Sequence, residues 1–248
     1  HNFKVGMDVS LVRLVLGCDS YGNSPHSFAG AITNGVTPTG GSPFTPTDAT
    51  YNPLTGEMVI TKASHGLTPA TTKTADSAAY DPSTGILTVT SNIHGMANGT
   101  YIKFAKNSFR FTCGQDGDAT NHDYPRESDP VYNKWLEISN ITLNTFEVNV
   151  GTSENTSVHN FVSAIPNGIQ VATSSVGFST GAICFYCAQD NYQSSKCYPR
   201  TTDPAHNAVI GVETVTTNSF IVNIGVSTTG KFPDNNGRIF TVKSVPSS

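Results

Sequence analysis

A long internal repeat limits the folds open to this chain more than any other feature of its sequence. Residues 111–151 return as residues 185–225, shifted by 74 positions without a gap. The matched residues of the first copy are Phe111, Cys113, Gln115, Asp116, Tyr124, Pro125, Arg126, Asp129, Pro130, Asn133, Asn144, Phe146, Val148, Asn149 and Gly151. An ungapped repeat leaves no room for different strand registers in the two copies. We therefore expect residues 107–153 and 181–227 to be two copies of one antiparallel β module.

Two shorter repeats accompany the long one. Residues 49–66 return at 78–95, a shift of 29, and each copy contains an Asn/Asp-Pro-x-Thr-Gly turn followed by an apolar run. Proline presets φ and glycine supplies positive φ, so each copy is predicted to be a β-hairpin. Residues 26–36 return at 159–169, and the Asn-Gly pair in each copy predicts a tight turn between two short strands.

The composition also favours strands. Thr, Ser, Asn and Gly are abundant and only 13% of residues are charged, which disfavours long amphipathic helices. We expect an all-β chain of tandem antiparallel β-sandwich-like modules with internal repeats and little helix. Residues 1–44 would form N-terminal strands and a Thr/Pro/Gly linker, residues 45–165 the hairpin repeats and the first long module, and residues 166–248 the second module and C-terminal strands.

Individual strands can be placed from the alternation of apolar and polar residues. We expect them at about 101–105, 108–113, 135–142, 145–150, 182–187, 208–215 and 219–224. Residues 68–77 show no hydrophobic period and are predicted to be a mobile loop.

Charge and hydropathy exclude two classes of partner. The net charge is -4 and the isoelectric point is about 5.9, so the chain has no cationic field for a phosphate backbone. The longest apolar stretch, residues 9–16, is interrupted by Arg13 and is far shorter than the roughly 20 residues of a membrane span. We expect neither nucleic-acid binding nor a membrane span.

The N-terminal residues predict self-association. Residues 3–16 alternate like a strand, and their only charges are Lys4, Asp8 and Arg13, so the strand edge is poorly protected. We expect this strand to add to the sheet of a second copy and make the chain a homo-oligomer. The alternative is a strand buried within its own domain. His1 begins a His-Asn-Phe sequence that recurs inside the chain, so it is expected to be a processed or truncated start.

Two repeated charge pairs are candidates for recognition or for loop stapling. Arg126 with Asp129, and Arg200 with Asp203, lie in the proline-rich loops of the two copies. A guanidinium can form a forked pair with a carboxylate and so rigidify its own loop, or it can bind an acidic sugar or a partner carboxylate. Both copies keep the pair, which favours neither interpretation.

Metal binding, cofactor binding and catalysis are not expected. Cys113, Asp116 and His122 resemble a ligand set, but zinc needs about four donors and the second copy has Lys196 in place of the histidine. No nucleophile elbow, zinc-protease motif or phosphate loop is present in the sequence. The matched residues His65 and His94 lie in His-Gly turns, where turn chemistry is the expected role.

Five cysteines make an odd count, so at least one thiol is expected to be unpaired. Cys113 and Cys187 read as small buried hydrophobic residues on the strand that enters the loop. Cys184-x-x-Cys187 lacks the strand-turn-helix setting of a redox motif. If a bridge forms, the predicted pair is Cys187 with Cys197, because Cys197 occurs only in the copy whose loop it could close.

The motifs occur in a fixed order along the chain, namely Tyr80-Asp-Pro-Ser-Thr-Gly85, Asn107-Ser-Phe-Arg-Phe-Thr-Cys113, Tyr124-Pro-Arg126 with Asp129-Pro130, and His159-Asn-Phe161. In this combination the chain resembles the β-rich repeat modules of virion structural proteins in tailed bacteriophages, especially marine cyanobacterial phages. The resemblance covers about residues 26–36 and 49–225. The second copy departs from the pattern, since Lys196 and Cys197 replace the loop histidine and aspartate and it has no preceding hairpin of its own.

The resemblance implies a non-enzymatic component of the virion, such as a tail fibre, tail-tip or capsid-surface decoration protein. The implied partners are the chain itself, other virion proteins and a host surface glycan. Two alternatives from other classes remain. One is a secreted cell-surface or fibre-forming protein of bacteria or archaea, and the other is a carbohydrate-binding module.

Overall fold

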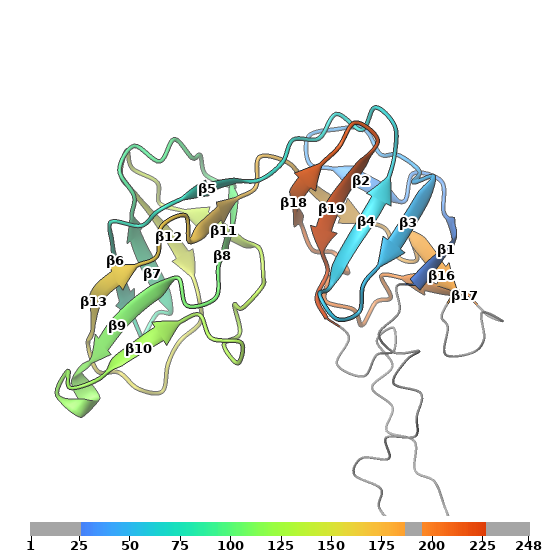
Figure 1. Cartoon of the computed structure of the whole chain (residues 1–248). Coiled ribbons are helices and arrows are strands. Elements are labelled where there is room, and N and C mark those ends of the chain that lie inside the picture. Colours follow the sequence, from blue (N-terminus) through green and yellow to red (C-terminus); the bar gives the residue numbers. More distant parts are fainter. Residues whose placement is uncertain (1–25, 187–194, 227–248) are drawn as a thin grey trace, which may run out of the picture.

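The computed structural model describes residues 26–186 and 195–226, which form two β-rich lobes side by side (Figure 1). These residues contain nineteen β-strands and one short 3-10 helix, Gly114–Asp116 (η1). The ladders between the strands are antiparallel, as in the pairing of the first strand with its two neighbours. The prediction of an all-β, antiparallel, sandwich-like fold is confirmed. The strand predicted at residues 3–16 lies outside the described residues.

The first lobe, which we call module I, combines residues 26–67 with residues 174–186 and 195–226. Its strands are β1 (His26–Ala31), β2 (Val36–Pro38), β3 (Asp48–Tyr51), β4 (Glu57–Thr61), β15 (Ser175–Phe178), β16 (Ile183–Tyr186), β17 (Ser195–Tyr198), β18 (Ile210–Val215) and β19 (Ser219–Asn223). They form one sheet in the order β17-β16-β1-β3-β4-β19-β18-β15-β2. Strands β15 and β16 are consecutive in the chain but lie towards opposite edges of this sheet. The sheet must therefore curl around its core to bring these edges together.

The second lobe, module II, is continuous in sequence from residue 68 to residue 173. Its strands are β5 (Thr71–Lys73), β6 (Ser77–Asp81), β7 (Ile86–Thr90), β8 (Tyr101–Phe104), β9 (Phe109–Cys113), β10 (Asn121–Tyr124), β11 (Leu136–Ser139), β12 (Thr145–Asn149), β13 (His159–Ala164) and β14 (Ile169–Val171). They form a sheet of three strands, β10-β9-β13, and a sheet of seven, β5-β14-β8-β11-β12-β7-β6.

The two modules have one strand arrangement in two chain orders. Strands β6 and β7 correspond to β3 and β4, β8–β12 to β15–β19, and β13 and β14 to β1 and β2. Phe146 and Phe220, both fully buried, are paired with the equivalent residues Val89 and Ile60. The predicted equivalence of the two long copies is confirmed. Because module I begins with the strand pair that ends module II, the modules are circular permutants, and module II is inserted between β4 and β15.

The sheets group the residues differently from the predicted ranges 1–44, 45–165 and 166–248. The first hairpin, β3 with β4, was expected to belong with the first long copy. In the structure β4 pairs along its whole length with β19, which lies in the second long copy. The physical reason is that β19 covers the free edge of this hairpin, as β12 covers the edge of the second hairpin.

Both predicted hairpins are present, and their glycines have two roles. Gly56 and Gly85 have φ angles of 77° and 75°, a region that side chains with a Cβ rarely adopt. A Cβ on Gly85 would also lie 2.5 Å from the carbonyl carbon of Gly151, and one on Gly56 would lie 2.5 Å from that of Gly225. The glycine therefore allows the turn and also lets another backbone segment pass directly against it.

The shorter repeats show one confirmed turn and one error. Asn34 and Asn167 both have φ of 56°, so the predicted tight turns are confirmed. The mobile loop predicted at residues 68–77 is wrong at β5, whose Lys73 is paired with Ile169 of β14. The side chains of β5 are mostly exposed, and for this reason they show no hydrophobic period although the backbone completes a sheet edge.

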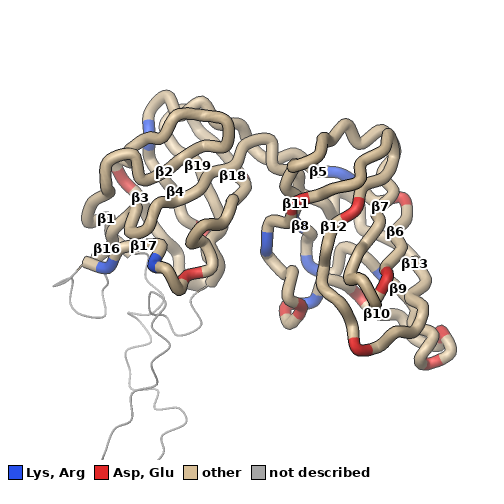
Figure 2. Tube along the Cα trace, turned by 180° about the vertical axis from the view of Figure 1, so that it is seen from behind, with Lys and Arg blue, Asp and Glu red and all other residues tan. Residues whose placement is uncertain are grey.

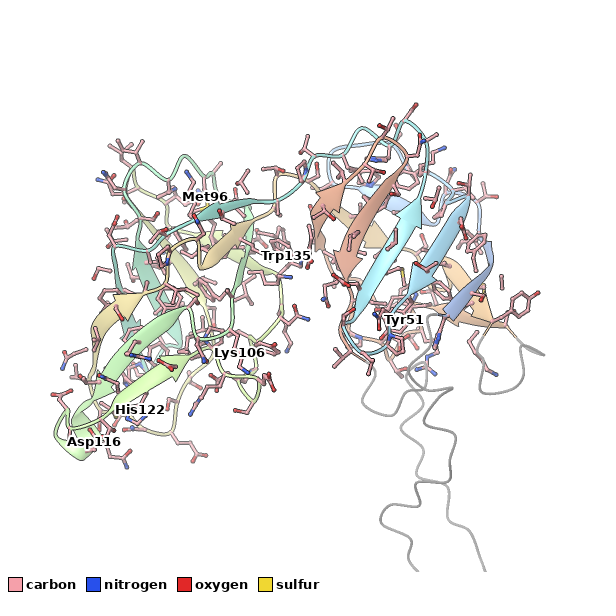
Figure 3. The ribbon with its side chains drawn as sticks, in the orientation of Figure 1. Tyr51, Met96, Lys106, Asp116, His122 and Trp135 are labelled. Atoms are coloured by element: carbon pink, nitrogen blue, oxygen red, sulfur yellow. A yellow bond between two sulfur atoms is a disulfide. The ribbon has the colours of Figure 1, made fainter. Side chains whose placement is uncertain are left out.

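Module II contacts module I through the chain's only tryptophan. Trp135 packs against the core of module I, and Figure 3 shows it on the side of module II that faces the other lobe. A Cβ on Gly211 of β18 would lie 2.4 Å from the indole, so the glycine makes room for this contact. Beside it, the Lys103 Nζ atom lies 5.2 Å from the indole centroid and pairs with Glu213. The Asn133 side chain also donates to the Asn223 Oδ1 atom at 2.8 Å.

Charged residues are sparse on both modules. Figure 2 shows Lys and Arg at separated positions along the trace, with Asp and Glu between them. No helix in the described part of the chain has the length and apolar character needed to cross a membrane.

Candidate ligand pocket of module II

The proline-rich loop of the long repeat is stapled in the same way in both modules. The Arg126 amide donates to the Asp129 Oδ2 atom at 2.7 Å, and its Nη2 atom donates to Oδ1 at 3.0 Å. Arg200 and Asp203 repeat these contacts at 2.8 and 3.0 Å. Both Tyr-Pro peptide bonds of the motif are cis, Tyr124-Pro125 and Tyr198-Pro199. Each guanidinium is thus engaged by the carboxylate of its own loop, and a role in recognition stays a prediction.

A tyrosine at the end of each hairpin anchors the chain that follows the last long strand. The Tyr80 hydroxyl donates to the Gly151 carbonyl at 2.8 Å, and the Tyr51 hydroxyl donates to the Gly225 carbonyl at 2.8 Å. His159 lies edge-on to Tyr80 at a centroid distance of 5.6 Å. Its counterpart His26 lies edge-on to Tyr51 at 5.4 Å. The repeat therefore preserves a specific constellation and not only a pattern of strands.

In module II these residues surround a cavity of about 490 Å³. Aromatic and apolar side chains form its wall, chiefly Tyr80, Phe111 and Tyr124 with Leu87 and Val150. Its polar lining residues are Gln115, Asp116, His122, Asp123, Arg126, Asp129, Thr152, Ser153, Asn155 and His159. Asp116 and His122 lie at the end of module II that is remote from module I, as Figure 3 shows.

Two polar atoms of the cavity's residues have no hydrogen-bond partner within the described part of the chain. They are the Tyr124 hydroxyl and the His159 Nδ1 atom, and both are buried. Burial raises the pKa of the Tyr124 hydroxyl, and the nearby Asp129 carboxylate raises it further. Burial likewise raises the pKa of Tyr80, with a smaller effect from Asp81. Both hydroxyls are therefore protonated donors at neutral pH.

A threonine hydroxyl connects two polar residues of the cavity, Asp116 and His122. Thr120 donates to Asp116, and its hydroxyl also lies 3.0 Å from the His122 Nε2 atom. The bond from this hydroxyl is the main cause that lowers the pKa of Asp116. In a catalytic relay the carboxylate holds the far ring nitrogen of the histidine. Here the Asp116 carboxylate and the His122 Nε2 atom both contact the Thr120 hydroxyl, so Asp116 lies on the Nε2 side of the ring.

Cys113 also lies against the cavity and is buried and unpaired, which confirms the expected free thiol. The Asn155 side-chain amide donates to its sulfur at 3.1 Å and to the Gln115 Oε1 atom at 2.9 Å. Within the described ranges, no group of three or more His, Cys, Asp or Glu side chains is placed to hold a metal ion. The Asn155 side-chain amide thus links Cys113, at the end of β9, to Gln115 in the short helix η1 that follows.

The corresponding residues of module I are more deeply buried. Tyr51, Tyr198 and Asp203 are 4%, 3% and 5% exposed, whereas Tyr80, Tyr124 and Asp129 are only partly buried. Burial raises the pKa of Tyr51 to about 12, with a further contribution from the Asp203 carboxylate. Cys187, Gln189 and Asp190, which correspond to cavity-lining residues of module II, lie outside the described residues.

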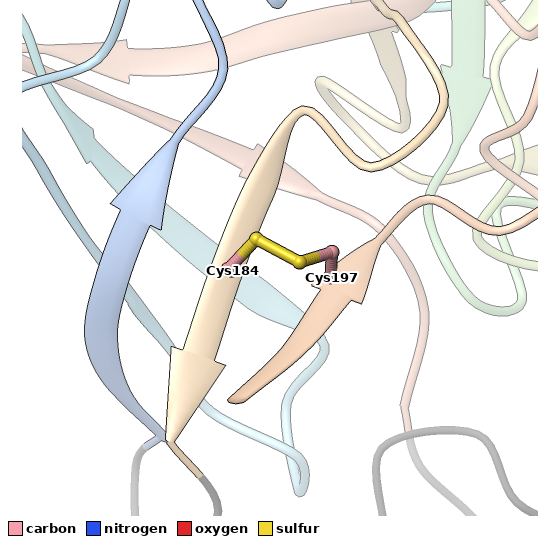
Figure 4. The surroundings of a disulfide bond; sticks show 2 residues. All are labelled: Cys184 and Cys197. Atoms are coloured by element: carbon pink, nitrogen blue, oxygen red, sulfur yellow. A yellow bond between two sulfur atoms is a disulfide. The ribbon is translucent and has the colours of Figure 1, made fainter. Parts of the chain in front are cut away.

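The predicted bridge between Cys187 and Cys197 is wrong, because Cys197 is bonded to Cys184 (Figure 4). Cys184 and Cys197 lie directly opposite each other on the paired strands β16 and β17. The equivalent facing pair in module II is Arg110 and Asp123, which form an ion pair at 2.7 Å. One cross-strand position is thus held by a covalent bond in module I and by opposite charges in module II.

The predicted turn role of the two matched histidines is confirmed. The His65 Nδ1 atom accepts the Leu67 amide at 3.1 Å, and the His94 Nδ1 atom accepts the Met96 amide at 3.1 Å. The Nε2 atom of each ring faces a backbone carbonyl, at 3.0 and 3.2 Å respectively. Since Nδ1 accepts, Nε2 carries the proton, and both rings act as neutral turn caps.

The cavity was not predicted from the sequence, although several residues that line it belong to the repeated motifs. Tyr80, Tyr124 and His159 each belong to a repeated motif, but they lie far apart in the sequence. Their recurrence in both copies was the available signal, and it was interpreted as scaffold alone. Comparison with protein-family models, with curated proteins and with solved structures finds no match for this chain.

Proposed function

We propose that this chain is a non-enzymatic structural protein of a tailed-phage virion, located in a tail fibre, the tail tip or the capsid surface. The observation that carries the proposal is the use of the repeated motif as scaffold in both modules. The Arg-Asp staple and the bond from Tyr80 to Gly151 recur with nearly the same distances in module I. Residues that served a reaction would not be expected to act as loop supports in both internal copies.

The contact between the modules also supports a structural role. Trp135 and the paired side chains of Lys103 and Glu213 are placed at the boundary, with the two charged side chains only 9% and 16% exposed. An interface with packed aromatic and paired polar groups holds two domains in a fixed relation better than an open linker does. A structural component of a particle needs this stiffness, because it holds neighbouring proteins at fixed positions.

The direct test is to look for the chain in purified particles. Mass spectrometry of particles banded on a density gradient is expected to detect the chain at a fixed ratio to the major capsid protein. Immunogold labelling with antibodies against residues 26–226 then gives its position on the particle. Detection only in the cell envelope, with none in particles, would overturn the proposal and favour the cell-surface alternative.

The expected partners are a second copy of the chain and other virion proteins. The segment proposed to mediate self-association, residues 3–16, lies outside the described residues. Light scattering after size exclusion separates the two interpretations, with the intact chain compared to one that lacks residues 1–16. An oligomer that becomes a monomer on truncation supports self-association through this strand, and a monomer in both samples at micromolar concentration excludes it.

A further inference from the structure

A buried ion pair at the boundary between the modules is not part of the repeated scaffold. Lys103 of β8 is only 7% exposed, and its partner is Glu213 of β18. At the shift of 74, Gly177 corresponds to the lysine and Ser139 corresponds to the glutamate. Each charged side chain therefore occurs once in a fold that is built twice. Burying two charges costs free energy that their mutual attraction often only offsets, so this added pair points to a use beyond packing.

Three reactive side chains meet at this boundary. The Lys103 Nζ atom donates to the Glu213 carboxylate, and it also lies 3.4 Å from the Asn133 Oδ1 atom. The other end of that carboxamide is fixed, because the Asn133 Nδ2 atom donates to the Asn223 Oδ1 atom at 2.8 Å. The Trp135 ring lies 5.2 Å from the Nζ atom. An amine, a carboxamide and a carboxylate are thus held together at a site largely shielded from water.

These three groups are sufficient to join the lysine side chain to the asparagine side chain. Glu213 takes a proton from the Lys103 ammonium, which leaves a neutral amine with a free electron pair. This pair attacks the Asn133 Cγ atom and forms a C–N bond. Glu213 then gives its proton to the Nδ2 atom, and the bond from Cγ to Nδ2 breaks. Ammonia leaves and takes up the second proton of the attacking nitrogen, so the products are a secondary amide and one ammonium ion.

The fold supplies the conditions that this otherwise slow reaction needs. Amine and carboxamide are held close to contact distance, which replaces a bimolecular encounter by a step within one molecule. Low exposure to water also reduces the advantage that hydration gives to the charged forms of an amine and a carboxyl group. Lys103 and Asn133 belong to module II, whereas Glu213 belongs to module I. The site is therefore complete only when the two modules are docked.

We propose that Lys103 and Asn133 form an isopeptide bond, with Glu213 as the proton-transfer group. The bond joins β8 to the loop that precedes β11, so it ties two parts of module II together once module I is in place. The chain reacts once with itself and turns over no separate substrate. The mass of the chain decides this inference and says nothing about a virion. Detection in particles decides the structural role and says nothing about the bond.

Module I contains an internal control. Asn207 corresponds to Asn133, and the two residues have φ angles of 57° and 56°. Asparagine tolerates this left-handed conformation, which explains its presence in both copies. In module I, however, the position of the lysine is taken by Gly177. The Asn207 side chain should therefore keep its carboxamide.

Mass spectrometry of the purified full chain provides the test. After reduction and denaturation, the chain should be lighter than its sequence by the mass of one ammonia molecule. Trypsin does not cut after a lysine that is acylated at Nζ. Digestion should therefore release residues 74–106, uncut at Lys103, joined as a branched peptide to residues 127–134. Tandem fragmentation should place the junction at Asn133 and show Asn207 unchanged.

Three variants test the roles of the side chains. Lys103→Arg keeps a positive charge beside Glu213, but a guanidinium is not a nucleophile at neutral pH, so no branched peptide should form. Glu213→Gln keeps the size of the side chain and removes the base, and it should slow the reaction roughly 10²- to 10⁴-fold. Glu147→Gln removes a carboxylate bonded to Asn140 and is the matched control, which should react like the parent. Unchanged tryptophan emission shows that the modules of each variant remain docked.

A branched peptide that is absent from Lys103→Arg and delayed in Glu213→Gln supports the assignment. A folded parent chain in which trypsin cuts fully after Lys103 overturns it. Loss of ammonia with that cut retained means that Asn133 has closed on its own backbone, which also overturns it. Loss of water in place of ammonia, with Lys103 joined to Glu213, overturns the choice of acceptor. Equal rates in Glu213→Gln and the parent overturn the role of the glutamate.

Discussion

Removing the disulfide of module I should destabilise that module alone. The bond joins Cys184 and Cys197 across a separation of 13 residues. Closing a loop of this length restricts the unfolded chain by an entropy worth roughly 3 kcal/mol at 25 °C. The double variant Cys184→Ala with Cys197→Ala keeps both strands in register, because the backbone pairing of β16 with β17 does not depend on the sulfurs.

The expected loss can be followed as a shift in urea. With a denaturant slope of about 1.5 kcal/mol per molar urea for a small domain, a loss of roughly 3 kcal/mol lowers the midpoint by about 2 M. Hydrogen exchange with mass spectrometry across a urea series resolves the modules, since peptides from β18 report on module I and peptides from β11 on module II. Module II should keep the midpoint it has in the parent chain.

Module II also supplies the matched design. Replacing the cysteines by Cys184→Arg and Cys197→Asp copies the ion pair that Arg110 and Asp123 form at the equivalent position. Both partners of that pair are substantially exposed, so solvent screens their attraction and only a small part of the lost stability should return. An unchanged midpoint for module I in the Ala variant would refute the loop-closure reasoning. Equal losses in both modules would instead show that they unfold as one unit.

Three further outcomes follow from the packing and the charges. Gly211→Ala places a methyl group against the Trp135 indole at the module boundary, so the indole should become more exposed to water and its fluorescence should shift to the red and weaken. Gly177→Ala is the control, because its added methyl group makes only an ordinary contact at 3.8 Å and should leave the spectrum unchanged. Gly85→Asn should lower the melting temperature of module II much more than Gly95→Asn, because asparagine tolerates the positive φ of both sites but only the first meets another backbone, and equal losses would mean that strain alone matters. The pKa of Asp123 is lowered mainly by the hydrogen bond from Arg110, so this carboxylate contributes stability above its unfolded pKa and loses that contribution as pH falls below about 4. Thermal melts between about pH 5 and pH 2 should therefore show a smaller fall in melting temperature for Asp123→Asn than for the parent chain. Identical acid profiles of the two proteins would contradict this.

The repeats made the modules predictable, but not their order. Each repeat has its own offset, and a simple tandem array would show one offset throughout. The three offsets fit two permuted copies, yet the sequence does not say which hairpin joins which long copy. That choice is made by an edge contact such as Phe220 against Ile60, which joins residues far apart in the chain. Local pattern carries no information on such a contact.

The disulfide leaves a trace in the long repeat. At the shift of 74, Arg110 and Asp123 are replaced together by Cys184 and Cys197. A joint change from opposite charges to two cysteines is the trace of a pair that faces across two strands. The predicted pair of Cys187 with Cys197 rests on Cys197 being able to close the loop of its own copy, and it leaves the paired change out of account. The cavity was missed for a related reason, since its walls come from three separate repeats.

The permuted order has a mechanical consequence. His26 is paired with Tyr51, and the Tyr51 hydroxyl holds the Gly225 carbonyl, so residues 26 and 226 lie at the same end of module I. Strands β1, β3, β4 and β19 alternate in direction between these two points. Tension applied between residues 26 and 226 would break the hydrogen bonds of these ladders one after another from one end, and would not load them all at once in shear. Module II, inserted at the far side of that ladder, lies off the line of force and would keep its fold until module I has opened.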